Sequence, residues 1–133
     1  MRQLIDIPSL CACRTRSGDA EADFLAEQIE ELCGLKRVIG LAEVMDFLAV
    51  IHGEDRMMDI LKAAEDRGLY MQGHAPYVSG RMLSAYLCGG PNTCHETRAS
   101  DEGLEKLRSA MYVDARDSSI TKNVKDIWRV LSR

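Results

Sequence analysis

Three residues whose side chains suit metal chemistry stand at the ends of short apolar runs: Glu43, His74 and His95. Each run has the length and composition of a β-strand, and a helical pattern follows it. In a barrel of parallel strands the carboxyl ends meet on one face, so a carboxylate and two imidazoles placed there would converge. Such a set of oxygen and nitrogen donors predicts part of a site for a divalent metal.

The elements that must position these residues follow a regular order along the chain. Apolar runs predict strands over 4–11, 37–44, 69–72, 92–95 and 111–115. Helical spacing predicts helices over 19–33, 54–66, 79–87, 100–108 and 119–131, with Asp19 as a cap and His52 as a loop residue. Strict alternation of strand and helix implies parallel strands joined by right-handed crossovers.

The sequence therefore predicts an α/β fold with one domain over residues 1–133. A full (β/α)₈ barrel needs about 250 residues, roughly twice the 133 residues of this chain. We expect a partial, TIM-barrel-like arc of about five parallel βα units. In that arc Glu43, His74 and His95 would lie at the carboxyl ends of adjacent strands, with their side chains converging.

Composition and charge exclude several classes of protein. The net charge is −4 and basic residues are scattered between acidic ones, which argues against a nucleic-acid partner. No apolar run approaches the roughly 20 residues that span a bilayer, so no membrane partner is expected. The first residues lack a signal-peptide core, and five cysteines, an odd number, favour free thiols over a disulfide framework. We expect a cytoplasmic protein.

Three sequence blocks in a fixed order carry a family resemblance. They are Gly-Leu-Ala-Glu-Val-Met (40–45), Gly-His-Ala-Pro (73–76) and Cys-His-Glu (94–96). With Ala-Ser-Asp-Glu-Gly (99–103) and Met111, they resemble the adenine deaminases of the amidohydrolase superfamily in order and spacing. The resemblance runs from about residue 5 to residue 131, nearly the whole chain.

The resemblance implies a metal-dependent (β/α)₈ barrel with a small β-rich domain, of which this chain is an internal fragment covering strands three to seven. It implies that Glu43 is the metal-bridging carboxylate, His74 and His95 are metal ligands, and Glu96 is a catalytic candidate that holds substrate or orients His95. The implied activity is hydrolytic deamination of adenine to hypoxanthine and ammonia, in purine salvage. Imidazole and carboxylate ligands suit Mn²⁺ or Fe²⁺, with Zn²⁺ as the alternative.

The chain also departs from the family pattern. The His-x-His pair of the first barrel strand is not in this sequence, whose histidines are His52, His74 and His95. The aspartate of the final strand, which handles protons in the family mechanism, is not in it either. Ala110 stands where the family tends to have glycine, and Arg-Asp-Ser-Ser (116–119) replaces an Arg-Glu-Gly-Ser run. We therefore expect little or no activity from this polypeptide alone.

Two other functions remain open from the sequence. The chain could be a non-catalytic half-barrel that forms a homo-oligomer and so buries its open sheet edges. It could also be another amidohydrolase, acting on a different cyclic amide or amidine. A structural zinc site is a further, weaker hypothesis; it would use Cys33, Cys88, Cys94 and His95, although their spacing fits no compact Cys-x₂-Cys knuckle.

Overall fold

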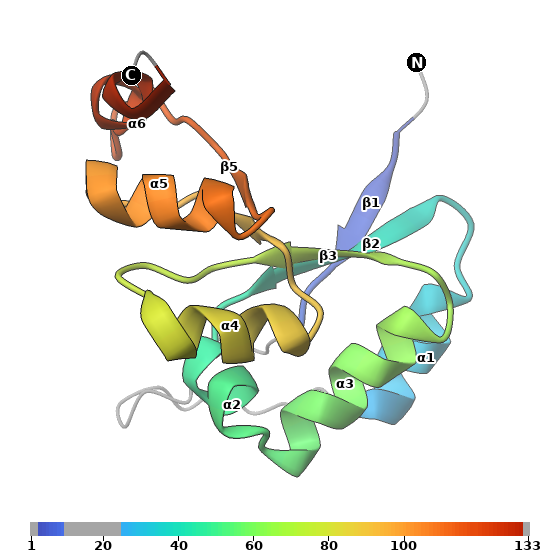
Figure 1. Ribbon diagram of the computed structural model, residues 1–133. Helices are drawn as coiled ribbons and strands as arrows, with labels where there is room; N and C mark the ends of the chain where they lie inside the picture. The colour runs from blue at the N-terminus through green and yellow to red at the C-terminus, as the bar shows by residue number, and fades with distance from the viewer. Residues whose placement is uncertain (1–2, 10–24, 132–133) are drawn as a thin grey trace.

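The computed structural model describes residues 3–9 and 25–131, where five short strands are connected by helices (Figure 1). The strands are β1 (Ile5–Ile7), β2 (Val38–Val44), β3 (Tyr70–Gly73), β4 (Thr93–Cys94) and β5 (Tyr112–Val113). The helices are α1 (Ala26–Cys33), α2 (Phe47–His52), α3 (Asp55–Glu65), α4 (Gly80–Cys88), α5 (Ser100–Arg108) and α6 (Val124–Leu131). The predicted α/β class is confirmed.

The strands pair in parallel and in chain order, but they form two sheets. One sheet has the order β1-β2-β3, with Gly40 opposite Tyr70, and the other pairs β4 with β5, with Thr93 opposite Tyr112. The expectation of parallel neighbours is therefore right within each sheet, whereas the ladder is interrupted between β3 and β4. The barrel arc remains a prediction, because the described strands do not close into one continuous sheet.

Helices α1 to α4 lie on one side of the three-stranded sheet, whereas α5 packs beside β5 and α6 packs against α5 (Figure 1). The apolar face of α3, which includes Met57, Ile60 and Leu61, is fully or almost fully buried. It shares one core with Leu41 and Val44 of β2. This core fixes β2 and β3 against the helices, and the carboxyl ends of these strands are thereby held in place. None of the described helices is long and apolar enough to cross a membrane.

The structure corrects the sequence analysis between β2 and β3, where two helices occur instead of one. Helix α2 was not predicted, and His52, expected in a loop, is its last residue. The Asp46 carboxylate accepts a hydrogen bond from the Ala49 amide at 3.2 Å, and Gly53 ends the helix in the left-handed region at φ +66°. A helix of six residues is too short to show a clear apolar period.

The ends of the chain differ from expectation as well. Helix α6 begins at Val124 rather than at residue 119, because Asp117 and Lys122 form an antiparallel bridge around a turn. The Ser118 hydroxyl accepts the Thr121 amide within that turn, at 3.0 Å. The predicted helix start at Asp19 lies outside the described residues.

The joint between the two sheets depends on a glycine. The Gly73 amide donates to the Thr93 hydroxyl at 2.7 Å, and that hydroxyl donates to the Gln72 side-chain oxygen at 3.2 Å. A Cβ atom on Gly73 would lie 2.1 Å from the Thr93 carbonyl oxygen and 2.8 Å from the Tyr86 hydroxyl. Only glycine therefore allows the ends of β3 and β4 to approach this closely.

This contact predicts that Gly73→Ala destabilises the protein strongly. Overpacking a well-filled site costs about 1–3 kcal/mol, and a clash with backbone places this variant at or above the upper end. Gly103→Ala is the matched control, because its Cβ would meet only a Thr97 methyl at 3.4 Å. Inside α5 that alanine should add up to about 1 kcal/mol of stability. Urea unfolding followed by circular dichroism measures both, and equal midpoints for the two variants would contradict the close approach.

Candidate metal centre

The three residues singled out from the sequence come together at the carboxyl ends of three strands. Glu43 is the last residue but one of β2, His74 directly follows β3, and His95 directly follows β4. Glu43 Oε1 lies 2.8 Å from His74 Nδ1 and 3.0 Å from His95 Nε2, and the two nitrogens are 3.4 Å apart. The predicted convergence of these side chains is confirmed; their role as metal ligands remains a prediction.

These distances suit a shared cation. Metal–ligand bonds of about 2.0–2.2 Å place neighbouring ligand atoms about 2.8–3.6 Å apart in octahedral or tetrahedral geometry. All three measured separations fall in that range. Lone pairs of one oxygen and two nitrogens that face one another at these distances repel unless a proton or a cation lies between them. The arrangement of donor atoms thus fits a divalent metal.

Two of the three candidate ligands are held by contacts around them. The Ser9 hydroxyl donates to the Glu43 carbonyl at 2.8 Å, which ties the end of β2 to the segment after β1. The His74 amide donates to the hydroxyl of the fully buried Tyr86 at 3.0 Å. The His74 ring also packs near the Phe47 ring, with centroids 6.4 Å apart. The His74 imidazole is therefore positioned from both its backbone and its ring.

The electrostatic environment favours the form of His74 that can bind a metal. Burial lowers the pKa of this imidazole below its usual value, against the opposing effect of the Glu43 carboxylate. A lowered pKa keeps the ring neutral, with a free nitrogen lone pair. The Glu43 side chain is 39% exposed and that of His74 only 16%, so the centre opens to solvent on its carboxylate side.

Glu96 lies directly after His95 and is engaged by two arginines. Its Oε1 accepts a hydrogen bond from Arg116 Nη1, and its Oε2 faces Arg98 as an ion pair rather than a well-aligned hydrogen bond. The guanidinium groups fix the carboxylate beside the candidate centre. Its expected part in holding substrate or orienting His95 stays a prediction.

The structure gives no support to a zinc site built on cysteine. Among residues 3–9 and 25–131, the group of potential ligands close enough to share an ion is Glu43, His74 and His95, and no cysteine joins it. Cys94 is buried and its sulfur lies 3.3 Å from Lys106 Nζ, while Cys33 and Cys88 are free thiols. The alternative ligand set drawn from the sequence does not assemble here.

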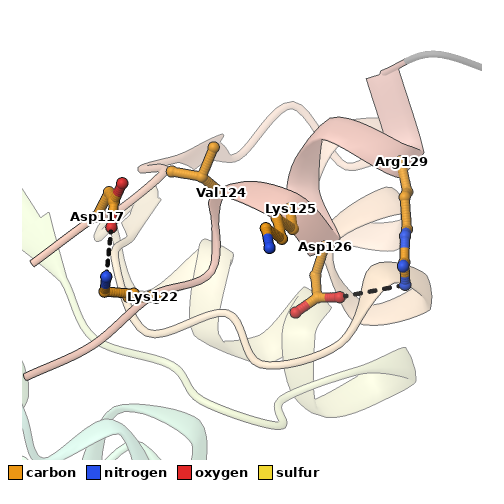
Figure 2. A pocket seen from close by; sticks show the side chains of 6 residues that line it. All are labelled: Asp117, Lys122, Val124, Lys125, Asp126 and Arg129. Atoms are coloured by element: carbon orange, nitrogen blue, oxygen red, sulfur yellow. Dashed lines mark ion pairs between the residues drawn. The ribbon is translucent and has the colours of Figure 1, made fainter.

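A separate pocket of about 430 Å³ lies near α6, away from the three candidate ligands (Figure 2). Its carboxylates are already paired, Asp117 with Lys122 at 3.4 Å and Asp126 with Arg129 at 3.8 Å. The lining residues are Asp117, Lys122, Val124, Lys125, Asp126 and Arg129. None of them was expected to carry chemistry, and the pocket contributes nothing to the candidate centre.

Sequence reasoning missed the polar residues that support the centre. Tyr86 and Thr93 fix the backbone at His74 and Gly73, and the buried pair of Glu102 and Lys106 contacts the segments that follow both histidines. The available signal was a Lys and a Glu four residues apart in a helix, which normally indicates a solvated face. Only the burial of Glu102 and Lys106 distinguishes them from such an exposed pair.

Comparison with known proteins identifies the relatives of this chain. No family model matches it. It is 40% identical to an adenine deaminase of Methanothermobacter thermautotrophicus over 117 residues, which cover 88% of this chain and 22% of that protein. It is 41% identical to an adenine deaminase of Shewanella halifaxensis over 118 residues, or 89% of this chain and 19% of that one.

A third relative extends the match. Adenine deaminase 2 of Carboxydothermus hydrogenoformans is 35% identical over 127 residues, which cover 96% of this chain and 22% of that protein. The chain therefore spans about a fifth of the length of the curated relatives it matches. Over almost all of its own length it is related to a segment of the adenine deaminases, which confirms the resemblance carried by its three sequence blocks.

Proposed function

We propose that this chain carries part of the metal site of an adenine deaminase, with Glu43, His74 and His95 as ligands. The proposed reaction consumes adenine and water and yields hypoxanthine and ammonia, in purine salvage. The observation that carries the proposal is the meeting of three donor atoms within 3.4 Å of one another at strand ends. It is supported by the match to adenine deaminases across the same segment.

The donor set suits Mn²⁺, Fe²⁺ and Zn²⁺, because all three accept imidazole and carboxylate ligands. We expect Mn²⁺ or Fe²⁺, with Zn²⁺ as the alternative. When bound, such an ion lowers the pKa of a water ligand so that hydroxide is available near neutral pH. Glu43 contributes the negative charge of the site and its most exposed side chain, whereas His74 and His95 contribute ring nitrogens from its more buried side.

In the proposed site Glu96 supplies a hydrogen-bond acceptor whose position is fixed. A carboxylate held by Arg98 and Arg116 offers a hydrogen-bond acceptor at a defined place. That property suits a residue that holds a substrate N–H group or orients His95.

The first prediction of this proposal concerns metal binding by the chain. A titration with Mn²⁺, followed by the loss of the free-ion signal in electron paramagnetic resonance, should detect weak binding by the wild type. His74→Ala and His95→Ala should each abolish it, because two remaining ligands cannot replace the four or more of a complete site. His52→Ala is the matched control: His52 is exposed at the end of α2 and should leave binding unchanged.

Two outcomes would contradict these assignments. Unchanged uptake in the double variant His74→Ala/His95→Ala would move the site elsewhere on the chain. Loss of binding in His52→Ala alone would place the ligands near α2 instead.

The second prediction concerns turnover. An absorbance assay for conversion of adenine, with and without added Mn²⁺, should detect little or no activity of the 133-residue chain. The family's proton-handling aspartate is not in this sequence, and acid–base groups typically contribute about 10²- to 10⁴-fold to rate. Robust turnover by the pure chain would show that this group is dispensable. Turnover of another cyclic amide in place of adenine would instead favour a different amidohydrolase.

A further inference from the structure

Helix α5 carries a buried ion pair that the proposed reaction does not use. Lys106 is completely buried, the Glu102 side chain is 7% exposed, and Lys106 Nζ lies 2.5 Å from Glu102 Oε1. Removing two charged groups from water is costly, and a pair of well-packed apolar side chains often serves stability as well or better. Stability alone therefore does not explain this buried pair, whereas its other contacts do.

Those contacts are made with the two histidine loops, the segments that follow His74 and His95. Glu102 Oε1 accepts the Tyr77 amide at 2.8 Å, three residues after His74, and Oε2 accepts the Arg98 amide at 3.0 Å, three residues after His95. Lys106 Nζ donates to the carbonyl of Ala75, the residue after His74, at 2.5 Å. It also lies 3.3 Å from the sulfur of Cys94, the residue before His95.

The loop after His74 needs such support. Tyr77 has a φ of +60°, in the left-handed region that non-glycine residues rarely adopt. Its side chain is 75% exposed, so packing of the ring does not hold this conformation. A strained backbone persists only where its surroundings determine it, and the hydrogen bond to Glu102 does so here.

We propose that Glu102 and Lys106 are positioning residues that set the distance between His74 and His95. This inference rests on the proposed metal site. One carboxylate bridges the two loops through their amides, and the ammonium group neutralises that carboxylate while it fixes the carbonyl beside His74. Through this pair, helix α5 supports the loops that follow both imidazoles, and we call Glu102 and Lys106 the brace. Removal of the pair would let the two rings separate without disturbing the core around α3.

Amide hydrogen exchange of the wild-type chain, measured by NMR, gives a first test that needs no substitution. The Tyr77 and Arg98 amides should exchange at least about tenfold more slowly than unstructured peptide, since each is bonded to a buried carboxylate. Exchange of both amides at the unstructured rate would overturn the proposal.

Two variants test the brace directly. Glu102→Gln halves the acceptors available to the loops, and the double variant Glu102→Leu/Lys106→Met replaces the pair by apolar groups that can pack in its place. Both should lose protection at Tyr77 or Arg98, and the nuclear Overhauser contacts between the His74 and His95 rings, whose centroids are 5.3 Å apart, should weaken. The urea midpoint of the double variant should stay near that of the wild type, which separates positioning from folding.

The control is the other Lys–carboxylate pair at a spacing of four residues, Lys62 with Asp66, which is exposed and lies at the end of α3. Lys62→Met/Asp66→Asn should leave the exchange rates and the ring contacts unchanged. A folded double variant on α5 that keeps both amides protected and both rings in contact would overturn the proposal. If that variant does not fold, the exchange rates of the wild type and of Glu102→Gln decide.

A Mn²⁺ titration of the same variants links the brace to the metal site. Substitution of residues that orient metal ligands typically weakens binding by about 10- to 100-fold, and we expect that loss in both α5 variants and none in the control. If the wild type binds no Mn²⁺, the proposed metal site fails, whereas exchange and ring contacts still decide whether Glu102 and Lys106 position the histidines. Metal affinity unchanged in an α5 variant with loosened loops would overturn the link between the two.

Discussion

The contact between the ends of β3 and β4 is the constraint on which the candidate centre depends. The two strands do not form a regular ladder; the Gly73 amide is bonded instead to the Thr93 side chain. Because Gly73 has no side chain, the Thr93 carbonyl can approach to a distance that any Cβ would forbid. His74 and His95 follow these two strands directly, so this joint between the sheets sets the spacing of the imidazoles.

Several polar contacts around the candidate centre act on backbone near the three candidate ligands. Tyr86 accepts the His74 amide, Ser9 holds the Glu43 carbonyl, and Glu102 accepts amides from both histidine loops. None of these groups needs to touch a metal. They limit the movement of the candidate ligands, and a pre-set geometry would reduce the ordering that a cation would otherwise have to impose. The exposure of the Glu43 side chain leaves the carboxylate side of the candidate centre open to solvent.

The residues that could be found from sequence were those tied to a local pattern. Glu43, His74 and His95 could be predicted because each ends an apolar run, and parallel strands bring their carboxyl ends to one edge of a sheet. The α/β class followed from the alternation of runs, and α3 and α5 were placed to within one residue. Helix α2 was missed because six residues carry no clear period, and the delayed start of α6 because a turn around Ser118 precedes it.

Other features could not be predicted because they depend on tertiary contacts. The break between β3 and β4 arises from one side-chain hydrogen bond, which no pattern of apolar residues reports. The burial of Lys106 could not be predicted from sequence either, since a Lys four residues after a Glu is typical of an exposed helix face. Tyr86 could be read as one more apolar position of α4, whereas its hydroxyl is the acceptor that holds the His74 backbone.

The central claim is that Glu43, His74 and His95 bind one divalent ion together. Crystals of the chain soaked in Mn²⁺, with diffraction collected on the low-energy side of the iron edge, would locate the ion by its anomalous scattering. The account predicts a peak within bonding distance of Glu43 Oε1, His74 Nδ1 and His95 Nε2. A peak elsewhere on the chain, or none at saturating Mn²⁺ with the three side chains still in contact, would contradict it.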